Sequence, residues 1–283
     1  MQYVQAVVLG AVQGLTEFIP ISSDGHLFIL RELMRWPDQG LLFDAVLHFG
    51  TLAAIIIVLW REVRDLFIGA WQVIRQRSLT RTPQQRLLVA VVIATLPAAL
   101  AGYFLEDLFT DVYRNTLSVG LWFAATGAFY FFTEQIITTR HTRKTHQGEQ
   151  KLRPTFFRAL LIGLAQVMAL LPGVSRSGTT IATGTLLGLS REAAARFSFV
   201  IAAPIVAGAS ALSLVDLIRE GGSNSAEVSW GPLVLGTVAA LIVGVLALKS
   251  LLRFVKRRSL RVFGAYLLTL GAIVIALRVM GIW

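Results

Sequence analysis

The stretch Gln13-Gly-Leu-Thr-Glu17-Phe-Ile-Pro-Ile-Ser22-Ser23-Asp24-Gly25-His26 places a carboxylate, two hydroxyls, a second acid and an imidazole inside an otherwise apolar run. A similar polar break follows at Pro172-Gly-Val-Ser175-Arg176-Ser177-Gly178-Thr179-Thr180. Polar groups of this kind are rare at membrane depth, and there they mark functional sites. We interpret the two breaks as the halves of one buried site in a membrane protein.

The rest of the chain is strongly apolar, with 55% hydrophobic and only 15% charged residues. Soluble globular proteins carry about 25% charged residues. Six apolar runs approach the ~20 residues that cross a bilayer as a helix, and they lack the alternation of barrel strands. We therefore predict an all-α polytopic membrane protein. The runs are Leu41–Trp60, Leu87–Leu105, Leu117–Phe132, Phe197–Ile218, Trp230–Leu248 and Val262–Leu277.

The formal net charge of +10 invites a nucleic-acid interpretation. However, the basic residues cluster between the apolar runs, as cytoplasmic loops of membrane proteins require. We therefore expect no nucleic-acid partner. The chain has no cysteine, which excludes disulfides, thiolate nucleophiles and thiolate metal sites.

The charged segments between the runs predict the topology. By the positive-inside rule, segments 61–86, 134–158 and 249–261 are cytoplasmic. Segments 106–114 and 219–227 are net acidic and fit the outside.

This assignment leaves four short apolar segments that cannot each cross the bilayer. Each pair must enter and return through the same face, the first pair from outside and the second from inside, as two re-entrant hairpins beside six full spans. The hairpins pair Val4–Ile19 with His26–Met34, and Ala159–Leu171 with Thr179–Leu189.

The second half of the chain echoes the first. Gly10-Ala-Val-Gln13 matches Gly163-Leu-Ala-Gln166, and the second break matches the first with one inserted residue. We predict an inverted-topology repeat, approximately 1–133 and 155–283, within one membrane domain of residues 1–283 and joined by a basic cytoplasmic loop. Such repeats place a site near the bilayer midplane, where broken helices meet. Helix starts at that point bind anions such as phosphate.

Glu17 lies deep in an apolar helix, where an acid costs roughly 2.5–3.5 kcal/mol on insertion scales. Gln13 is four residues earlier and shares its helix face. The functional interpretation is a catalytic acid; the alternative is a protonated Glu hydrogen-bonded in a helix interface.

Ser22, Ser23 and Asp24 are residues of the type that caps helix N-termini. Ser23 and His26 are three positions apart, so they could share a face of the first helical turn. A hydroxyl beside an imidazole is the arrangement of an activated nucleophile. Capping and catalysis are compatible at this position.

Arg176 offers a fixed positive charge among hydroxyls and helix-start amides, and its fork suits phosphate. The alternative is a structural pair with Glu17. His48, in an apolar run near the first break, is expected to be a polar residue of a helix interface. The substrate-binding residues we predict are Gln13, Ser22, Asp24, Ser175, Ser177, Gly178, Thr179 and Thr180.

Together these residues fit hydrolysis of a phosphoanhydride whose other end is a lipid. The acid could hold a divalent cation that neutralises the pyrophosphate, or it could act as a base. One carboxylate does not decide between these roles.

Along essentially its whole length the chain resembles the undecaprenyl pyrophosphate phosphatase family, also called the bacitracin-resistance protein family. The family's first motif appears as Gln13-Gly-Leu-Thr-Glu17 and continues as Pro20-Ile-Ser22-Ser23-Asp24-Gly25-His26. Its Pro-Gly-x-Ser-Arg-Ser-Gly motif appears as Pro172-Gly-Val-Ser175-Arg176-Ser177-Gly178.

The resemblance implies a membrane phosphatase with six spans, two re-entrant hairpins and an inverted repeat. It implies that Glu17, His26 and Arg176 are essential, that Ser23 is the nucleophile, and that Ser175 and Thr180 line the site. It also implies a divalent cation, Mg²⁺ or Ca²⁺, with Glu17 as a ligand. The expected partners are the polyprenyl pyrophosphate lipid and membrane lipids, with a homodimer left open.

The role implied is recycling of the lipid carrier of cell-wall synthesis in the bacterial plasma membrane, which confers bacitracin resistance. The active site would open to the outside.

Two departures from the family pattern affect the metal and the substrate. Many members have Glu where this chain has Gln13, which removes a possible metal-binding carboxylate. Thr is frequent at the position of Asp24, whose charge could repel an anion or help to hold a cation.

Two other functions compete with this one. A transporter or flippase of polyprenyl phosphate would need the Arg176 cradle but no nucleophile, so Ser23 and His26 favour the enzyme. The membrane phosphatases that resemble acid phosphatases need a His after their Ser-Arg pair. The segment that follows Arg176, Ser-Gly-Thr-Thr-Ile-Ala182, has none, which excludes that mechanism.

Overall fold

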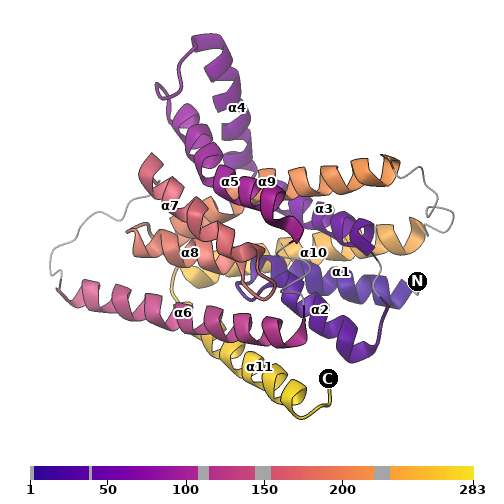
Figure 1. Cartoon of the computed structure of the whole chain (residues 1–283). Helices are drawn as coiled ribbons and strands as arrows, with labels where there is room; N and C mark the ends of the chain where they lie inside the picture. Colours follow the sequence, from indigo (N-terminus) through magenta and orange to yellow (C-terminus); the bar gives the residue numbers. More distant parts are fainter. Residues whose placement is uncertain (1–2, 38–39, 108–114, 144–153, 220–229) are drawn as a thin grey trace.

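The computed structural model describes residues 3–37, 40–107, 115–143, 154–219 and 230–283 (Figure 1). Within these ranges the regular structure is entirely helical, as predicted. The elements are α1 (Tyr3–Phe18), α2 (Ser23–Met34), α3 (Gly40–Val58), α4 (Trp60–Gln76), α5 (Pro83–Asp107), α6 (Thr116–Arg143), α7 (Phe156–Val167), the 3-10 turn η2 (Met168–Leu170), α8 (Arg176–Leu186), α9 (Arg191–Arg219), α10 (Trp230–Val255) and α11 (Arg261–Val279).

Among the described helices, α5, α6, α9, α10 and α11 are each long and apolar enough to cross a membrane. The pair α3 and α4 passes the same test together, although the two are bent by 88° at a short break. The described chain therefore has five spans, or six with the bent pair, which confirms a polytopic membrane protein. Most of the two acidic segments, at 108–114 and 220–227, lies outside the described residues.

The predicted basic loops are shorter than expected, because α6 continues to Arg143 and α10 to Val255. We expected residues 61–86 to form a loop, but most of this segment is α4. Aromatic and aliphatic residues recur at helical spacing among the arginines here, and this amphipathic period was the signal available in the sequence.

Glycines bring the helices of the bundle close together. A Cβ at Gly10 of α1 would lie 2.0 Å from the carbonyl oxygen of Gly236 in α10. A Cβ at Gly163 of α7 would likewise lie 2.5 Å from the oxygen of Ala94 in α5. Small residues at such contacts allow the backbone approach on which membrane helix packing depends.

Helices α6 and α11 pack antiparallel along a second glycine contact. A Cβ at Gly271 would lie 2.6 Å from the Gly120 oxygen, and a Cβ at Gly127 would lie 2.7 Å from the Gly264 oxygen. Gly120, near the start of α6, thus contacts Gly271 in the second half of α11, while Gly127 contacts the earlier Gly264. This pair flanks one side of the bundle (Figure 1).

Both polar breaks interrupt helices where the sequence predicted. α1 ends at Phe18 and α2 begins at Ser23, while η2 ends at Leu170 and α8 begins at Arg176. The Tyr130 hydroxyl of α6 donates to the Pro20 carbonyl oxygen over 3.0 Å and packs tightly against Gly178. Tyr130 therefore ties the two breaks to one point inside the bundle.

Candidate active site

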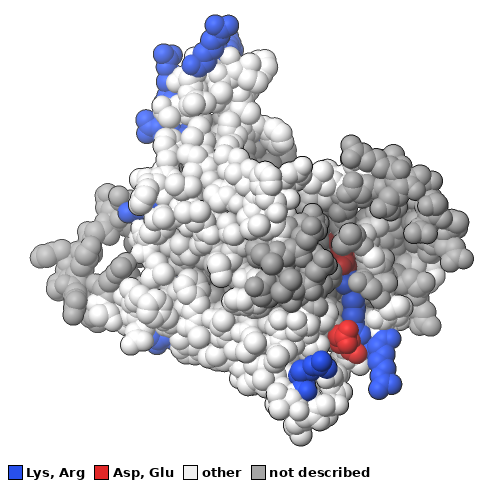
Figure 2. All heavy atoms as spheres, in the orientation of Figure 1, with Lys and Arg blue, Asp and Glu red and all other residues white. Residues whose placement is uncertain are grey.

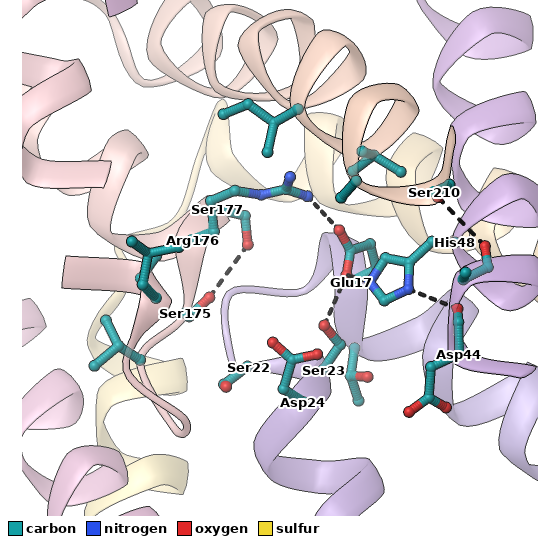
Figure 3. Close-up of a pocket in the computed structure, with 18 residues that line it drawn as sticks. Glu17, Ser22, Ser23, Asp24, Asp44, His48, Ser175, Arg176, Ser177 and Ser210 are labelled. Carbon is teal, nitrogen blue, oxygen red and sulfur yellow. Dashed lines mark hydrogen bonds and ion pairs between the residues drawn. The ribbon is translucent and has the colours of Figure 1, made fainter. Parts of the chain in front are cut away.

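A cavity of about 290 Å³ lies where the two breaks meet (Figure 3). Ligand pockets of proteins measure about 300–1,000 Å³, so this volume suits a phosphate headgroup rather than a whole lipid. Its polar lining residues are Thr16, Glu17, Ser22, Ser23, Asp24, Asp44, His48, Ser175, Arg176, Ser177 and Ser210.

Glu17 is the centre of the polar contacts in the cavity. Its side chain is buried, and its Oε1 accepts a hydrogen bond from Arg176 Nη2 in an ion pair between α1 and α8. Its Oε2 accepts from Ser23 Oγ over 2.7 Å and from Gln13 Nε2 over 3.3 Å. The carboxylate is thus compensated on both oxygens, as a buried charge requires.

Ser23 is the first residue of α2, and its hydroxyl points at Glu17 instead of capping the helix. The residue before it, Ser22, has a left-handed backbone with φ 72° and makes no side-chain capping bond. This turn directs the Ser23 side chain into the cavity (Figure 3). A hydroxyl that donates to a buried carboxylate is positioned to lose its proton to it.

Arg176 is the first residue of α8, directly after the capping Ser175. Ser175 Oγ accepts from the Gly178 amide over 3.2 Å and lies 3.2 Å from Ser177 Oγ. Arg176 therefore makes the structural pair with Glu17 that was the alternative, and it also lines the cavity. Its contact with phosphate stays a prediction. Only Nη2 of its guanidinium is used within the described chain.

His48, predicted to be a polar residue of a helix interface, lies between α3 and α1 and also lines the cavity, a position that the sequence did not predict. Its Nδ1 donates to the Asp44 carbonyl oxygen over 2.8 Å, and its Nε2 lies 3.9 Å from Glu17 Oε2. Asp44 also lines the cavity and forms an ion pair with Arg31 of α2. An ionisable residue within a membrane span is by default a functional candidate, and this was the missed signal.

His26 does not make the expected pair with Ser23. Its Nδ1 donates to the Ser22 carbonyl oxygen over 2.8 Å, and its Nε2 lies 2.7 Å from the hydroxyl of Tyr266 in α11. The two rings also stack, with centroids 5.6 Å apart. The imidazole therefore faces α11 and is not part of the described cavity lining.

Four of the predicted substrate-binding residues also lie outside that lining: Gln13 of α1, and Gly178, Thr179 and Thr180 of α8. The three residues of α8 are buried in its first turns. The Thr180 hydroxyl is shared between the Arg176 carbonyl oxygen, at 2.8 Å, and Ser198 Oγ, at 2.6 Å. Gln13 reaches the site only through Glu17.

The side chains at the site do not form a cage for a resident cation. Glu17 uses both oxygens for Arg176, Ser23 and Gln13. Across the described residues, no three His, Cys, Asp or Glu side chains come together in a way that could hold a metal ion. Gln13, where many family members have Glu, supplies no second carboxylate.

Comparison with known proteins shows the family of the chain. The family described as bacitracin resistance protein BacA matches residues 6–273. A protein named undecaprenyl-diphosphatase from Rubrobacter xylanophilus is 43% identical, over 98% of this chain and 98% of its own. Proteins with the same name are 41% identical in Thermomicrobium roseum, over 96% of each chain, and 35% identical in Methanosphaera stadtmanae, over 99% of each. The chain belongs to the bacitracin resistance protein family.

Proposed function

We propose that the protein is a membrane phosphatase that hydrolyses undecaprenyl pyrophosphate to the monophosphate and inorganic phosphate. One observation carries the proposal: a buried carboxylate, Glu17, holds the hydroxyl of Ser23 and the guanidinium of Arg176 on one cavity between two broken helices. The hydrolysis proposed here uses all three groups. The names of the similar proteins agree with this activity.

The first step is phosphoryl transfer to Ser23. Its proton passes to Glu17 Oε2, 2.7 Å away, as Oγ bonds to the terminal phosphorus. The bond from that phosphorus to the bridging oxygen breaks, and polyprenyl monophosphate leaves with the oxygen. Arg176 and the start of α8 stabilise the charge on the transferring phosphoryl group.

The second step is hydrolysis of the phosphoserine. Glu17 Oε2 and His48 Nε2 are 3.9 Å apart, a separation that one water molecule bridges. The oxygen of this water adds to phosphorus, and one of its protons passes to Ser23 Oγ as the phosphoserine bond breaks. Inorganic phosphate leaves, and Glu17 releases its proton to solvent.

A divalent cation remains a prediction from the family resemblance. The described side chains do not form a resident cation site. Mg²⁺ commonly binds through one or two carboxylates together with substrate phosphates. We propose that a cation, if used, arrives with the pyrophosphate, and phosphate release with and without a chelator measures this dependence.

We propose that the bundle is an inverted repeat in which α1 and α2, and α7 and α8, are re-entrant hairpins beside six spans. Two observations support it. The first hairpin packs on α10 and the second on α5, which are equivalent helices of the two halves. The hairpins also carry equivalent buried glutamines, Gln13 and Gln166, whose Oε1 atoms both lack a hydrogen-bond partner.

The basic segments favour a plasma-membrane orientation with residues 61–86 and 249–261 in the cytoplasm. In this orientation the first hairpin enters from outside, so the cavity would receive pyrophosphate from that face. The protein would then recycle the lipid carrier of cell-wall synthesis.

The decisive experiment is phosphate release from a long-chain polyprenyl pyrophosphate by the purified protein in detergent. Ser23→Ala is expected to lose at least about 100-fold in rate, because it removes the nucleophile. The rate of phosphate release is expected to fall more in His48→Ala than in Tyr266→Phe. This comparison tests whether the His48 imidazole on the cavity or the contact between His26 and Tyr266 matters for catalysis.

Ser210→Ala is the matched control, because this cavity-lining serine uses its hydroxyl on the Ala45 carbonyl oxygen. It should retain wild-type release. A folded wild type that binds the lipid but releases no phosphate would refute hydrolysis and favour lipid transport. Release unaffected by Ser23→Ala would move the nucleophile to an activated water.

A further inference from the structure

Helix α4 presents an uncovered apolar stripe along one face. Trp60, Phe67, Trp71 and Ile74 lie within about 60° of one another at 3.6 residues per turn. The last three are 72%, 64% and 73% exposed. The stripe runs over about 21 Å at 1.5 Å per residue, which is too long for a single headgroup.

The opposite face of α4 is the one that packs on the protein. A Cβ at Gly69 would lie 2.5 Å from the carbonyl oxygen of Gln84 at the start of α5. Thr82 Oγ1 donates to Gln72 Oε1, and Gln85 Nε2 donates to Gln76 Oε1 over 3.3 Å. The apolar stripe therefore points away from the described helices.

The bend before α4 is held in place by the protein. Leu59 at the break is fully buried, and Glu62 accepts from Arg196 of α9 over 2.6 Å. Because α3 and α4 meet at 88°, α4 lies in the plane of the membrane if α3 crosses it. Figure 1 shows α4 rising steeply from the bundle.

Arginines line one edge of the stripe. Arg64 and Arg75 follow Trp71 around the helix, and both are exposed. Figure 2 shows basic side chains gathered at the end of α4. An amphipathic helix with Trp and Phe on one face and arginines beside them binds a bilayer surface, and anionic lipids strengthen that binding.

We propose that α4 is an interfacial helix whose apolar stripe lies in the bilayer surface while Arg64 and Arg75 bind the headgroups of anionic phospholipids. Each Arg near such a surface adds to the attraction of the helix to anionic headgroups. The ligand is bilayer lipid rather than the substrate pyrophosphate, because the stripe is apolar along its full length. The inference does not depend on the proposed hydrolysis.

The absence of cysteine in the chain makes a direct test possible. A nitroxide is attached to Trp71→Cys in the full-length protein reconstituted into nanodiscs. Its collision rates with oxygen, which is enriched in the bilayer, and with a water-soluble nickel chelate are measured by electron paramagnetic resonance, and their ratio reports the depth of the label. Ile242→Cys, exposed on the span α10, is the deep control, and Arg257→Cys, exposed in the turn before α11, is the aqueous control.

The expected oxygen-to-nickel ratio at Trp71 is several-fold higher than at Arg257 and below that at Ile242. The label should move deeper when phosphatidylglycerol is added to phosphatidylcholine, and Arg64→Gln with Arg75→Gln should abolish that shift. A ratio equal to that at Arg257 would overturn the proposal. So would an unchanged depth in the two lipids, or spin–spin broadening that places a second copy of the chain on the stripe.

Discussion

The two helix breaks that meet at the cavity have similar sequences but opposite backbone designs. In the second break the left-handed position is Gly173, with φ 98°, which a glycine adopts without strain. In the first break it is Ser22, with φ 72°, where a residue with a Cβ stores about 1–3 kcal/mol. The first break is therefore the strained one.

The helix starts after the two breaks also differ in their capping, and again the second break has the more regular arrangement. Ser175 caps α8 in the ordinary way, with its hydroxyl on the Gly178 amide. Ser22, the N-cap residue of α2, makes no side-chain capping bond, and the hydroxyl of Ser23 donates to Glu17. The second break thus holds Arg176 at a capped, unstrained helix start. The first break is less stable locally, and its Ser23 hydroxyl donates to the Glu17 carboxylate.

The largest loss of activity is expected when the negative charge of Glu17, to which Ser23 of the first break donates, is removed. Glu17→Gln keeps the shape but loses the proton acceptor, so kcat should fall by about 10²- to 10⁴-fold. Phosphate release measures it, and thermal unfolding in detergent checks the fold. Gln166→Leu is the control, because this buried glutamine donates to the Ala94 carbonyl oxygen and is not part of the cavity lining. A Glu17→Gln enzyme within tenfold of wild type would contradict this role.

A smaller loss is expected at the second break. Arg176→Lys keeps the charge but loses the planar fork, and one charged hydrogen bond contributes about 1.5–3 kcal/mol, or about 10- to 100-fold. The KM for the lipid pyrophosphate should rise accordingly. Arg191→Lys is the matched control for Arg176→Lys, because Arg191 also forms an ion pair with a buried glutamate, Glu134, but away from the cavity. Equal losses in both variants would show that Arg176 acts only structurally.

Gly173→Ala should destabilise the protein by about 1–3 kcal/mol through backbone strain. The added Cβ would also lie 2.8 Å from the Val119 carbonyl oxygen. Thermal unfolding in detergent measures the change. Gly208→Ala in α9, with nothing within 4 Å of the new Cβ, should be neutral or stabilising. If both substitutions behaved alike, the left-handed turn would not limit stability.

The smallest effect, of opposite sign, is expected from Ser22→Gly. Glycine relieves the left-handed strain but loses more entropy on folding, so the net gain should be under about 1 kcal/mol. The midpoint of thermal unfolding should rise slightly. Ser22→Ala keeps the Cβ and should show no gain. A lower midpoint for Ser22→Gly would mean that the Ser22 side chain stabilises the first break.

Much of the site was predictable because polar groups are costly inside a bilayer. Glu17, Ser23 and Arg176 stand out for that reason, and the structure brings them together on one cavity. The same reasoning should have selected His48, but its run was interpreted as an ordinary span. Its distance from Glu17 depends on how α3 packs against the first hairpin.

Sequence spacing was a poor guide to the direction of side chains. Ser23 and His26 are three residues apart, yet Ser23 donates to Glu17 on the cavity and His26 contacts Tyr266 of α11, because each finds its own partner on a different helix. Thr180 is four residues after Arg176 but bonds to Ser198 of α9. Spacing rules assume a regular helix with no competing partner, and both conditions fail at helix starts.

By itself the sequence determined the membrane class, the positions of both breaks and the family, because composition and motifs are local properties. Only the tertiary structure decided which groups meet. It paired Arg176 with Glu17 across 159 residues, turned His26 toward Tyr266, brought His48 to the cavity and bent α4 away from α3. Each of these depends on packing between segments distant in the chain, where one helix rotation moves a side chain from the cavity to another interface.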